Sequence, residues 1–268
     1  MPCHICETCG TQYADTPEPP AHCRVCEDER QYVGWHGQRW TTHDALAQRY
    51  SLRIAEDDGL LGIALAGEFA IPQRALLLPT DAGNILWECV SLVTPEAVAA
   101  LRSRGGVDLI VISHPHFYSA MVEWSEALGG VPVLLHEADR GWVMRHAPQL
   151  AYWGGDTKRL SDAVTLIRCG GHFDGSTALQ WRTGPTPGGA LFPGDALQVA
   201  SDRRHVGFLY SYPNYIPMKA SDVRSLRERL APFDFEQVFG FSWGRNIRSG
   251  GRAAVDASFQ RHLEKVEA

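Results

Sequence analysis

In three separated parts of the chain, a strand-like run is followed directly by residues that can bind a metal. They are Ser113-His114-Pro115-His116, Gly171-His172-Phe173 and Gly194-Asp195. A His-x-His pair at the end of a strand can direct two imidazoles toward one point, and a third histidine and a carboxylate from other loops can complete the shell. Each motif alone is a weak signal, but all three share a position at a strand end. Together they predict one metal site formed by His114, His116, His172 and Asp195.

A second group of metal-binding residues lies near the N-terminus. Four cysteines form two Cys-x-x-Cys pairs, Cys6 with Cys9 and Cys23 with Cys26. Two such pairs supply the four thiolates of a tetrahedral structural zinc site, which leaves no coordination position for a substrate. Iron in a rubredoxin-like site accepts the same ligands. The pattern predicts a zinc ribbon whose role is folding or docking rather than catalysis.

The remaining cysteines leave alternatives open. Cys3 or His4 could replace one of the four thiolates, which would shift the register of the same module. Cys89 and Cys169 stand alone in apolar, strand-like sequence, where a buried and inert thiol is the usual state. Clustered cysteines in a reducing compartment favour metal binding over disulfides.

The elements that must position these residues begin after the cysteine-rich segment. Residues 1–30 are poor in large aliphatic residues, so we expect a metal-held module there and a second domain at 31–268. Apolar runs predict strands that lead to the site at Asn84–Cys89, Leu109–Ser113, Val164–Arg168 and Ala190–Pro193. Helical patterns occur at Pro95–Ser103, Phe117–Leu128, Asp139–Arg145, Ala220–Ala231 and Arg252–Glu267. This order predicts an α/β domain of packed sheets with helices outside.

The composition narrows the class of protein. The chain has 268 residues, of which 44% are hydrophobic and 21% are charged, as in an ordinary globular protein. Its net charge of −6 argues against a nucleic-acid surface, which normally carries a basic stripe. No apolar run approaches the roughly 20 residues of a membrane span, and no signal peptide is visible. We expect a cytoplasmic protein that acts on a small molecule; no sequence feature indicates the oligomeric state.

The order of the histidine and aspartate motifs resembles that of the metallo-β-lactamase superfamily, with its His-x-His-x-Asp-His, Gly-His and Gly-Asp motifs. The resemblance extends from about Tyr32 to the C-terminus and includes Asn84–Cys89, which resembles the strand before the histidine motif. It implies a four-layer αββα sandwich with metal at the edge where the two sheets meet. It also implies the ligands, which are His114, His116, His172 and the carboxylate of Asp195, a residue that bridges two metals in complete family members.

Departures from the family pattern imply a reduced site. The second-metal Asp and His of the family fall on Tyr118 and Ser119, neither of which is a good ligand there. The late Gly-His motif should fall near Phe239–Gly244, which contains no histidine. Asp195 alone remains of the usual second-site residues, so the resemblance implies one metal rather than two.

The resemblance implies a metal-dependent hydrolase. One zinc would lower the pKa of a bound water toward about 7 and activate it toward an ester, lactone, thioester or phosphoester. Asp195 could orient this water, and Tyr118 could donate a hydrogen bond to a developing oxyanion or simply pack beside the metal. The aromatic segment Phe208–Pro217 is a candidate wall of the pocket.

Two other functions stay open. Loss of the second-metal ligands and the added ribbon also fit a non-catalytic metal-binding or interaction protein. Superfamily members that resemble sulfur dioxygenases use one iron held by two His and one Asp, and His114, His172 and Asp195 could form such a site, with His116 idle. The sequence does not indicate the substrate, since a fold does not license a reaction.

Overall fold

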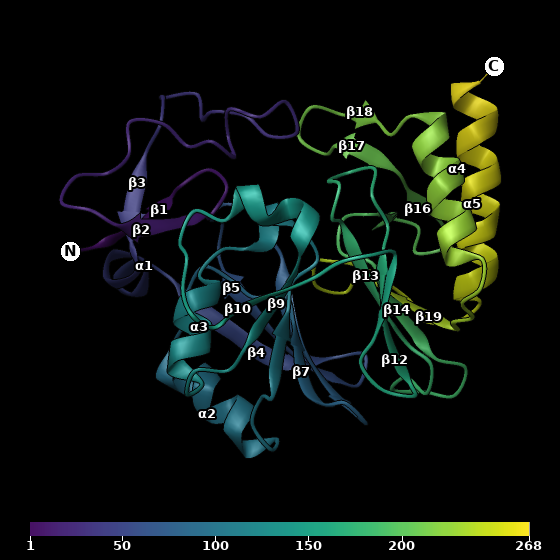
Figure 1. Cartoon of the computed structure of the whole chain (residues 1–268), viewed down its shortest axis with the longest axis horizontal. Coiled ribbons are helices and arrows are strands. Elements are labelled where there is room, and N and C mark those ends of the chain that lie inside the picture. Colours follow the sequence, from purple (N-terminus) through teal and green to yellow (C-terminus); the bar gives the residue numbers. More distant parts are fainter. Residues whose placement is uncertain (268) are drawn as a thin grey trace.

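The computed structural model describes residues 1–267 and has four layers. Two β-sheets face each other in the middle of the molecule (Figure 1). Helices α2 (Pro95–Ser103) and α3 (Met121–Ala127) cover the outer face of one sheet, and α4 (Ala220–Leu230) and α5 (Gly251–Val266) cover that of the other. The predicted αββα arrangement is therefore confirmed.

The first sheet has the strand order β10-β9-β8-β7-β6-β5-β4. Its strands are β4 (Ser51–Asp57), β5 (Leu60–Ala66), β6 (Arg74–Thr80), β7 (Gly83–Trp87), β8 (Leu109–Val111), β9 (Val133–His136) and β10 (Leu150–Trp153). Neighbours pair antiparallel from β4 to β7 and parallel from β7 to β10. The sequence pattern does not predict β4, because this edge strand is largely polar and half-exposed and therefore lacks an apolar run.

The second sheet has the order β11-β12-β13-β14-β19-β20. Its strands are β11 (Thr157–Arg159), β12 (Val164–Arg168), β13 (Thr177–Trp181), β14 (Ala190–Phe192), β19 (Gln237–Phe239) and β20 (Asn246–Ile247). Only the β14–β19 pair is parallel. Within this sheet Phe192 stacks on Phe239 with ring centroids 4.8 Å apart, and Trp87 of the first sheet packs against Phe192 across the interface, with ring centroids 6.4 Å apart.

The helices begin and end at recognisable residues. The side chain of Thr94 accepts a hydrogen bond from the Ala97 N–H, and Pro95 occupies the first turn of α2, as predicted. Thr42 caps α1 (His43–Arg49) in the same way. Within residues 1–267, no helix combines the length and the apolar character that crossing a membrane requires.

Two predicted helices differ from the structure. The helix predicted at Phe117–Leu128 starts later, at Met121, because Pro115–Phe117 form a 3-10 turn and Ser119 has a φ of 39°. A positive φ cannot continue a right-handed helix. The helix predicted at Asp139–Arg145 is instead a 3-10 helix over Glu137–Trp142.

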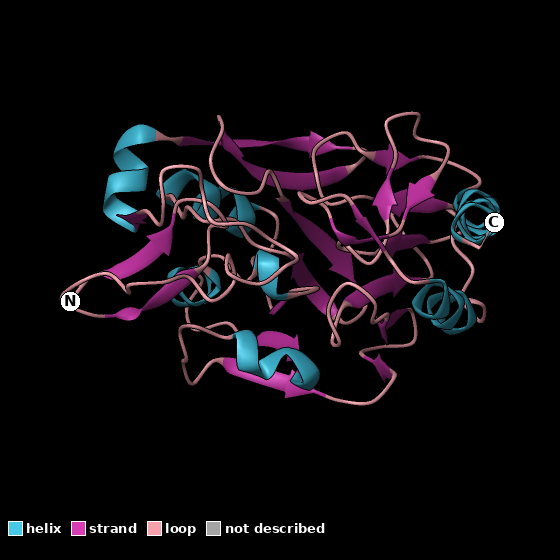
Figure 2. Ribbon diagram, turned by 90° about the horizontal axis from the view of Figure 1, so that it is seen from above, coloured by secondary structure: helices cyan, strands magenta, loops and turns pink. Residues whose placement is uncertain are grey.

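The N-terminal segment forms a small sheet of its own with the order β2-β1-β3. Its strands are β1 (Cys3–Cys6), β2 (Gln12–Asp15) and β3 (Trp40–Thr42). This sheet lies at the end of the molecule opposite α4 and α5 (Figure 2). Since β3 follows residue 30, the sheet uses strands from both sides of the predicted boundary, and the division of the chain there stays a prediction.

Two hairpins complete the fold. β15 (Gln198–Val199) pairs with β16 (Val206–Gly207), and β17 (Leu209–Ser211) pairs with β18 (Ile216–Pro217). The long segment between β2 and β3 crosses the top of the molecule and reaches the β17–β18 hairpin (Figure 1). Parts far apart in the sequence are therefore neighbours above the sheets.

Candidate metal centres

The four predicted ligands meet at one edge of the sandwich. His114 and His116 follow β8, His172 follows β12, and Asp195 follows β14. All four side chains are buried, and each offers a ligand atom that lies within 4.8 Å of the others. Strands from both sheets thus deliver the ligands to one point, as the sequence predicts.

The spacing of these atoms suits a small cation. His116 Nδ1 lies 3.2 Å from His172 Nε2, and His114 Nε2 lies 3.5 Å from Asp195 Oδ2. Zinc bonds of 2.0–2.1 Å in a tetrahedron would place neighbouring ligand atoms about 3.4 Å apart. The donor types and these two spacings therefore fit a tetrahedral metal.

Hydrogen bonds from outside the site orient two of the rings. His114 Nδ1 lies 2.8 Å from Ser113 Oγ, and His172 Nδ1 lies 2.8 Å from the carbonyl oxygen of Tyr210, to which it donates. In each ring this leaves Nε2 free for a metal. His114 Nε2 and Asp195 Oδ1 are buried without a hydrogen-bond partner, and such atoms call for a ligand.

Burial sets the protonation of the site. It raises the pKa of Asp195 to about 6 and lowers the pKa of His114 and of His172 to about 3. The histidines are therefore neutral at pH 7 and can offer lone pairs. A buried carboxylate without a cation is costly, and a bound divalent ion would offset this cost.

A second carboxyl group lies behind the histidines. Glu88 is fully buried and has a φ of 66°. Its Oε2 accepts a hydrogen bond from the Ser113 N–H at 3.2 Å, and burial raises its pKa to about 8. A Cβ on Gly194 would lie 2.2 Å from Ser113 Oγ, so only glycine allows the Gly-Asp turn to approach Ser113.

The two residues that replace second-metal ligands serve packing and docking. Tyr118 is buried in the core beneath the first sheet's helices and is not part of the pocket lining, which agrees with a packing role; its role as an oxyanion donor stays a prediction. The Ser119 hydroxyl accepts a hydrogen bond from Gln73 Nε2 at 2.8 Å. It faces the first cysteine pair, because a Cβ on Gly10 would lie 3.7 Å from it.

The four predicted cysteines form the second candidate centre. Cys6 and Cys26 have their sulfur atoms 3.5 Å apart, and those of Cys9 and Cys23 are 3.6 Å apart. Zinc–sulfur bonds of 2.3 Å would place them about 3.8 Å apart. All four side chains are buried, so this site is closed.

The alternative ligands of the ribbon lie outside this group. Cys3 is half-buried and is not one of the four clustered sulfurs. His4 instead places Nε2 3.1 Å from the Thr16 carbonyl oxygen. The predicted register of the two Cys-x-x-Cys pairs is therefore the observed one.

A pocket of about 300 Å³ opens beside the histidine centre. Two of the clustered ligands, His116 and Asp195, are among its lining residues. Tyr212 and Pro213 of the predicted aromatic wall line it, and Tyr212 donates a hydrogen bond to the Asp195 carbonyl oxygen at 2.7 Å. A larger groove of about 710 Å³ near α2 and α3 contains none of the clustered ligands, so the smaller pocket is the candidate site.

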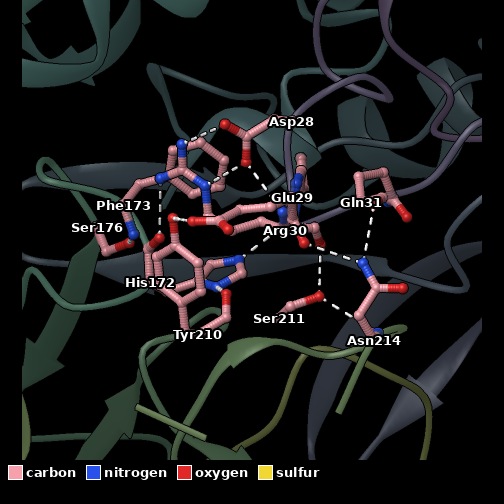
Figure 3. Close-up of polar contacts among 11 residues, drawn as sticks. Asp28, Glu29, Arg30, Gln31, His172, Phe173, Ser176, Tyr210, Ser211 and Asn214 are labelled. Carbon is pink, nitrogen blue, oxygen red and sulfur yellow. Dashed lines mark hydrogen bonds and ion pairs between the residues drawn. The ribbon is translucent and has the colours of Figure 1, made fainter. Parts of the chain in front are cut away.

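The segment that follows the cysteine pairs is docked against this centre (Figure 3). Arg30 donates one hydrogen bond to the His172 carbonyl oxygen at 3.1 Å, and its guanidinium lies 3.8 Å from the centre of the Phe173 ring. The same guanidinium forms an ion pair with Asp28, in which Arg30 Nε lies 2.6 Å from Asp28 Oδ1. The ribbon and the histidine centre are thus joined through a short polar network.

Sequence reasoning missed this network and the partners that orient the rings. Every residue has a backbone carbonyl, so a sequence pattern cannot indicate that the carbonyl of Tyr210 binds His172. Ser113 stands next to His114, so its role could have been inferred from adjacency. His205, another histidine of the same domain, pairs with Asp202 on an exposed loop and is not one of the clustered ligands.

The fold and the buried histidine group define a protein of the metallo-β-lactamase fold. No family model matches the chain. The DIM-1 metallo-β-lactamase aligns at TM-score 0.57 and 13% identity, over 81% of this chain and 97% of its own. VMB-1 aligns at TM-score 0.58 and 11% identity, over 81% and 98%. FIM-1 from Pseudomonas aeruginosa, in its mono-zinc form, aligns at TM-score 0.54 and 12% identity, over 81% and 95%.

A closer sequence relative shows the family. The uncharacterized protein YmaE of Bacillus subtilis (strain 168) is 37% identical over 269 residues, which cover 99% of this chain and 97% of that protein. This chain therefore belongs to the same protein family as YmaE. The solved structures, at their lower identity, share its fold.

Proposed function

We propose that this protein is a metal-dependent hydrolase with one zinc at the histidine centre. The observation that supports it best is the convergence of His114, His116, His172 and Asp195 at tetrahedral spacing, beside a pocket. Serine and tyrosine occupy the positions of the second-metal ligands, so the proposal is a single metal. The mono-zinc form of FIM-1 supports the idea that this fold can hold one zinc.

A bound zinc would supply Lewis acidity and would lower the pKa of a bound water toward about 7. The three histidines would hold the metal, and Ser113 and the Tyr210 carbonyl keep two of the rings in place. Asp195 Oδ1 has no hydrogen-bond partner and can hold the attacking water or its proton. The substrate in this proposal is a small ester, lactone, thioester or phosphoester, and the site of action is the cytoplasm.

The two alternatives have less support. In a mono-iron oxidoreductase with two histidines and one aspartate, His116 would be idle, but its Nδ1 lies 3.2 Å from His172 Nε2, among the ligand atoms. In a non-catalytic protein, a pocket that ends on Asp195 would have no use. We therefore propose zinc hydrolysis first.

Metal analysis tests the proposal. Protein purified without added metal should contain two zinc ions per chain, and His114→Ala/His116→Ala should contain one. One zinc and one iron, with the iron lost in the variant, would instead support the oxidoreductase. A panel of esters, lactones, thioesters and phosphoesters, tested at neutral pH, should be cleaved by the wild type only. If wild-type protein with two zinc ions cleaves none of them, the hydrolase proposal fails.

A further inference from the structure

The pocket beside the histidine centre is closed on one side by the zinc ribbon. Thr8, Gln31 and Tyr32 line it from the N-terminal segment, together with Tyr212 and Pro213 of the hairpin. Thr8 lies between the ligands Cys6 and Cys9, and Gln31 and Tyr32 follow Cys26 by a few residues. The same thiolate cluster therefore organises both parts of this wall.

This wall is fixed by contacts on both sides. Asn214 Nδ2 donates to the carbonyl oxygens of Glu29 and Gln31 at 2.9 and 3.0 Å, and Tyr210 donates to the Glu29 carboxylate at 2.8 Å (Figure 3). Ser211 Oγ donates to the Arg30 carbonyl oxygen at 3.1 Å. Six residues, three from the β17–β18 hairpin and three from residues 29–31, thus form a continuous seam beside the pocket.

The first cysteine pair also packs against the sandwich. Ser91 Oγ donates to the Gly10 carbonyl oxygen at 3.4 Å, and the Gln12 N–H donates to the Ser119 carbonyl oxygen at 3.3 Å. Gly10 fits because a Cβ there would lie 2.6 Å from Ser91 Oγ. The ribbon therefore contacts the sandwich a second time, beside Ser119, the position that a second-metal histidine would occupy.

The lining of the pocket is largely apolar and carries no cationic side chain. Ile71, Pro72 and Phe241 face the ribbon residues, and neither Lys nor Arg is among the lining residues. Arg30, next to Gln31, is committed to Asp28 and to the His172 carbonyl. An anionic substituent that lies away from the metal would therefore lose its hydration here without gaining a cationic side chain, whereas an alkyl or aryl group would be buried favourably.

We propose that the ribbon is a specificity element, with Tyr32 as its main contact, and that it restricts the site to neutral substrates with an apolar acyl group. This inference rests on the proposed function and narrows it to carboxylic esters, lactones and thioesters, without phosphoesters. It also gives the ribbon zinc a task in substrate binding.

Straight-chain hydroxamates test the wall without turnover. Their affinities for the zinc-loaded full chain are measured by calorimetry, from acetohydroxamate to octanohydroxamate. Each methylene that enters the pocket should tighten binding to the wild type about fourfold, the value expected for burial of one CH₂. In Tyr32→Ala the gain should fall below about twofold per methylene, because one apolar wall is missing. A hydroxamate that ends in a carboxylate should bind at least tenfold more weakly than a neutral one of equal length.

Trp35→Ala is the matched control. Trp35 lies on the same segment but is 97% exposed and does not line the pocket, so its removal should leave the gain per methylene at the wild-type value. Equal gains in the wild type and Tyr32→Ala would overturn the role of the ribbon. Tight binding of the anionic probe, or no hydroxamate binding at all, would overturn the substrate class. If the hydroxamates bind as expected but no ester is cleaved, the hydrolase proposal fails while the role of the ribbon in binding stands.

Discussion

The two candidate metal centres use burial for different purposes. Around the four cysteines every ligand faces another sulfur, so the site is closed and holds the chain together. Around the three histidines the rings are also buried, yet the lining of a pocket includes His116 and Asp195. Burial therefore does not distinguish a structural site from a reactive one. The two centres differ in access to a cavity: Asp195 lines a pocket and its Oδ1 has no hydrogen-bond partner, whereas the four thiolates face one another.

The two centres are also not independent. The chain leaves the last cysteine, passes through Asp28 and Arg30, and contacts the carbonyl of the ligand His172. A structural centre can thus support a reactive one through a few polar contacts. Four substitutions separate local effects at each centre from this coupling.

The largest effect is expected from Cys23→Ser/Cys26→Ser. A structural zinc contributes on the order of 10 kcal/mol to folding of its module, so the module should lose its metal and its fixed structure. Metal analysis should show one zinc lost, and hydrogen exchange should show fast exchange over β1 to β3. Cys3→Ser, outside the cluster, should keep both metals. Retention of both by the double variant would show that these thiolates are not the ligands.

Ser113→Ala should weaken only the histidine centre. Loss of the hydrogen bond to His114 Nδ1 should lower zinc affinity there by about 10–100-fold, as is usual for partners of metal-binding histidines. Competition with a chromophoric chelator measures this affinity. Ser125→Ala, a buried serine of α3 that bonds the Val131 carbonyl, is the matched control. Equal zinc affinity in both variants would contradict an orienting role for Ser113.

Glu88→Gln should change how stability depends on pH. Burial raises the Glu88 pKa from 4.5 to about 8, so the folded state favours the protonated acid. The stability that this provides is complete below about pH 4.5 and is lost as the pH rises toward 8. The variant should therefore gain stability relative to the wild type over this range, on the order of a few kcal/mol.

Urea unfolding of the zinc-loaded proteins at pH 5 and pH 8 measures the gain. The metal ligands are common to both proteins, so their own titration cancels in the difference. Glu126→Gln, at a half-exposed carboxylate, should follow the wild type at both pH values. Parallel curves for Glu88→Gln and the wild type would show that this carboxyl is not held neutral.

The smallest effect is expected from Arg30→Lys. An ammonium cannot make the forked contact with Asp28 or stack on Phe173 as a guanidinium does, which should cost about 1 kcal/mol. Zinc affinity at the histidine centre should fall a few-fold, and the ribbon zinc should stay. Arg24→Lys is the control, since the Arg24 side chain lies over Trp142 and donates to the Gly141 carbonyl oxygen rather than to a residue of the histidine centre. If Arg30→Lys and Arg24→Lys change zinc affinity at the histidine centre equally, the two centres are not coupled through Arg30.

The sequence could predict the ligands but not what surrounds them. Metal chemistry restricts ligands to few residue types, and strand ends are visible as apolar runs, so both clusters and the layered fold could be found. The interruption at Ser119 depends on one positive φ, and the edge strand β4 has no apolar run. The docking of Arg30 on a carbonyl, 142 positions away, depends on tertiary structure alone.

The seam between Glu29 and Tyr210 spans 181 positions of the chain, and this separation has a consequence for biosynthesis. The four cysteines leave the ribosome first and can take up zinc while the remainder is still being translated. His172, Asp195 and the β17–β18 hairpin, which contacts residues 29–31, are synthesised much later. We therefore expect the ribbon zinc to be acquired on the nascent chain and the histidine metal only after release, so that a shortage of zinc leaves the second site empty first.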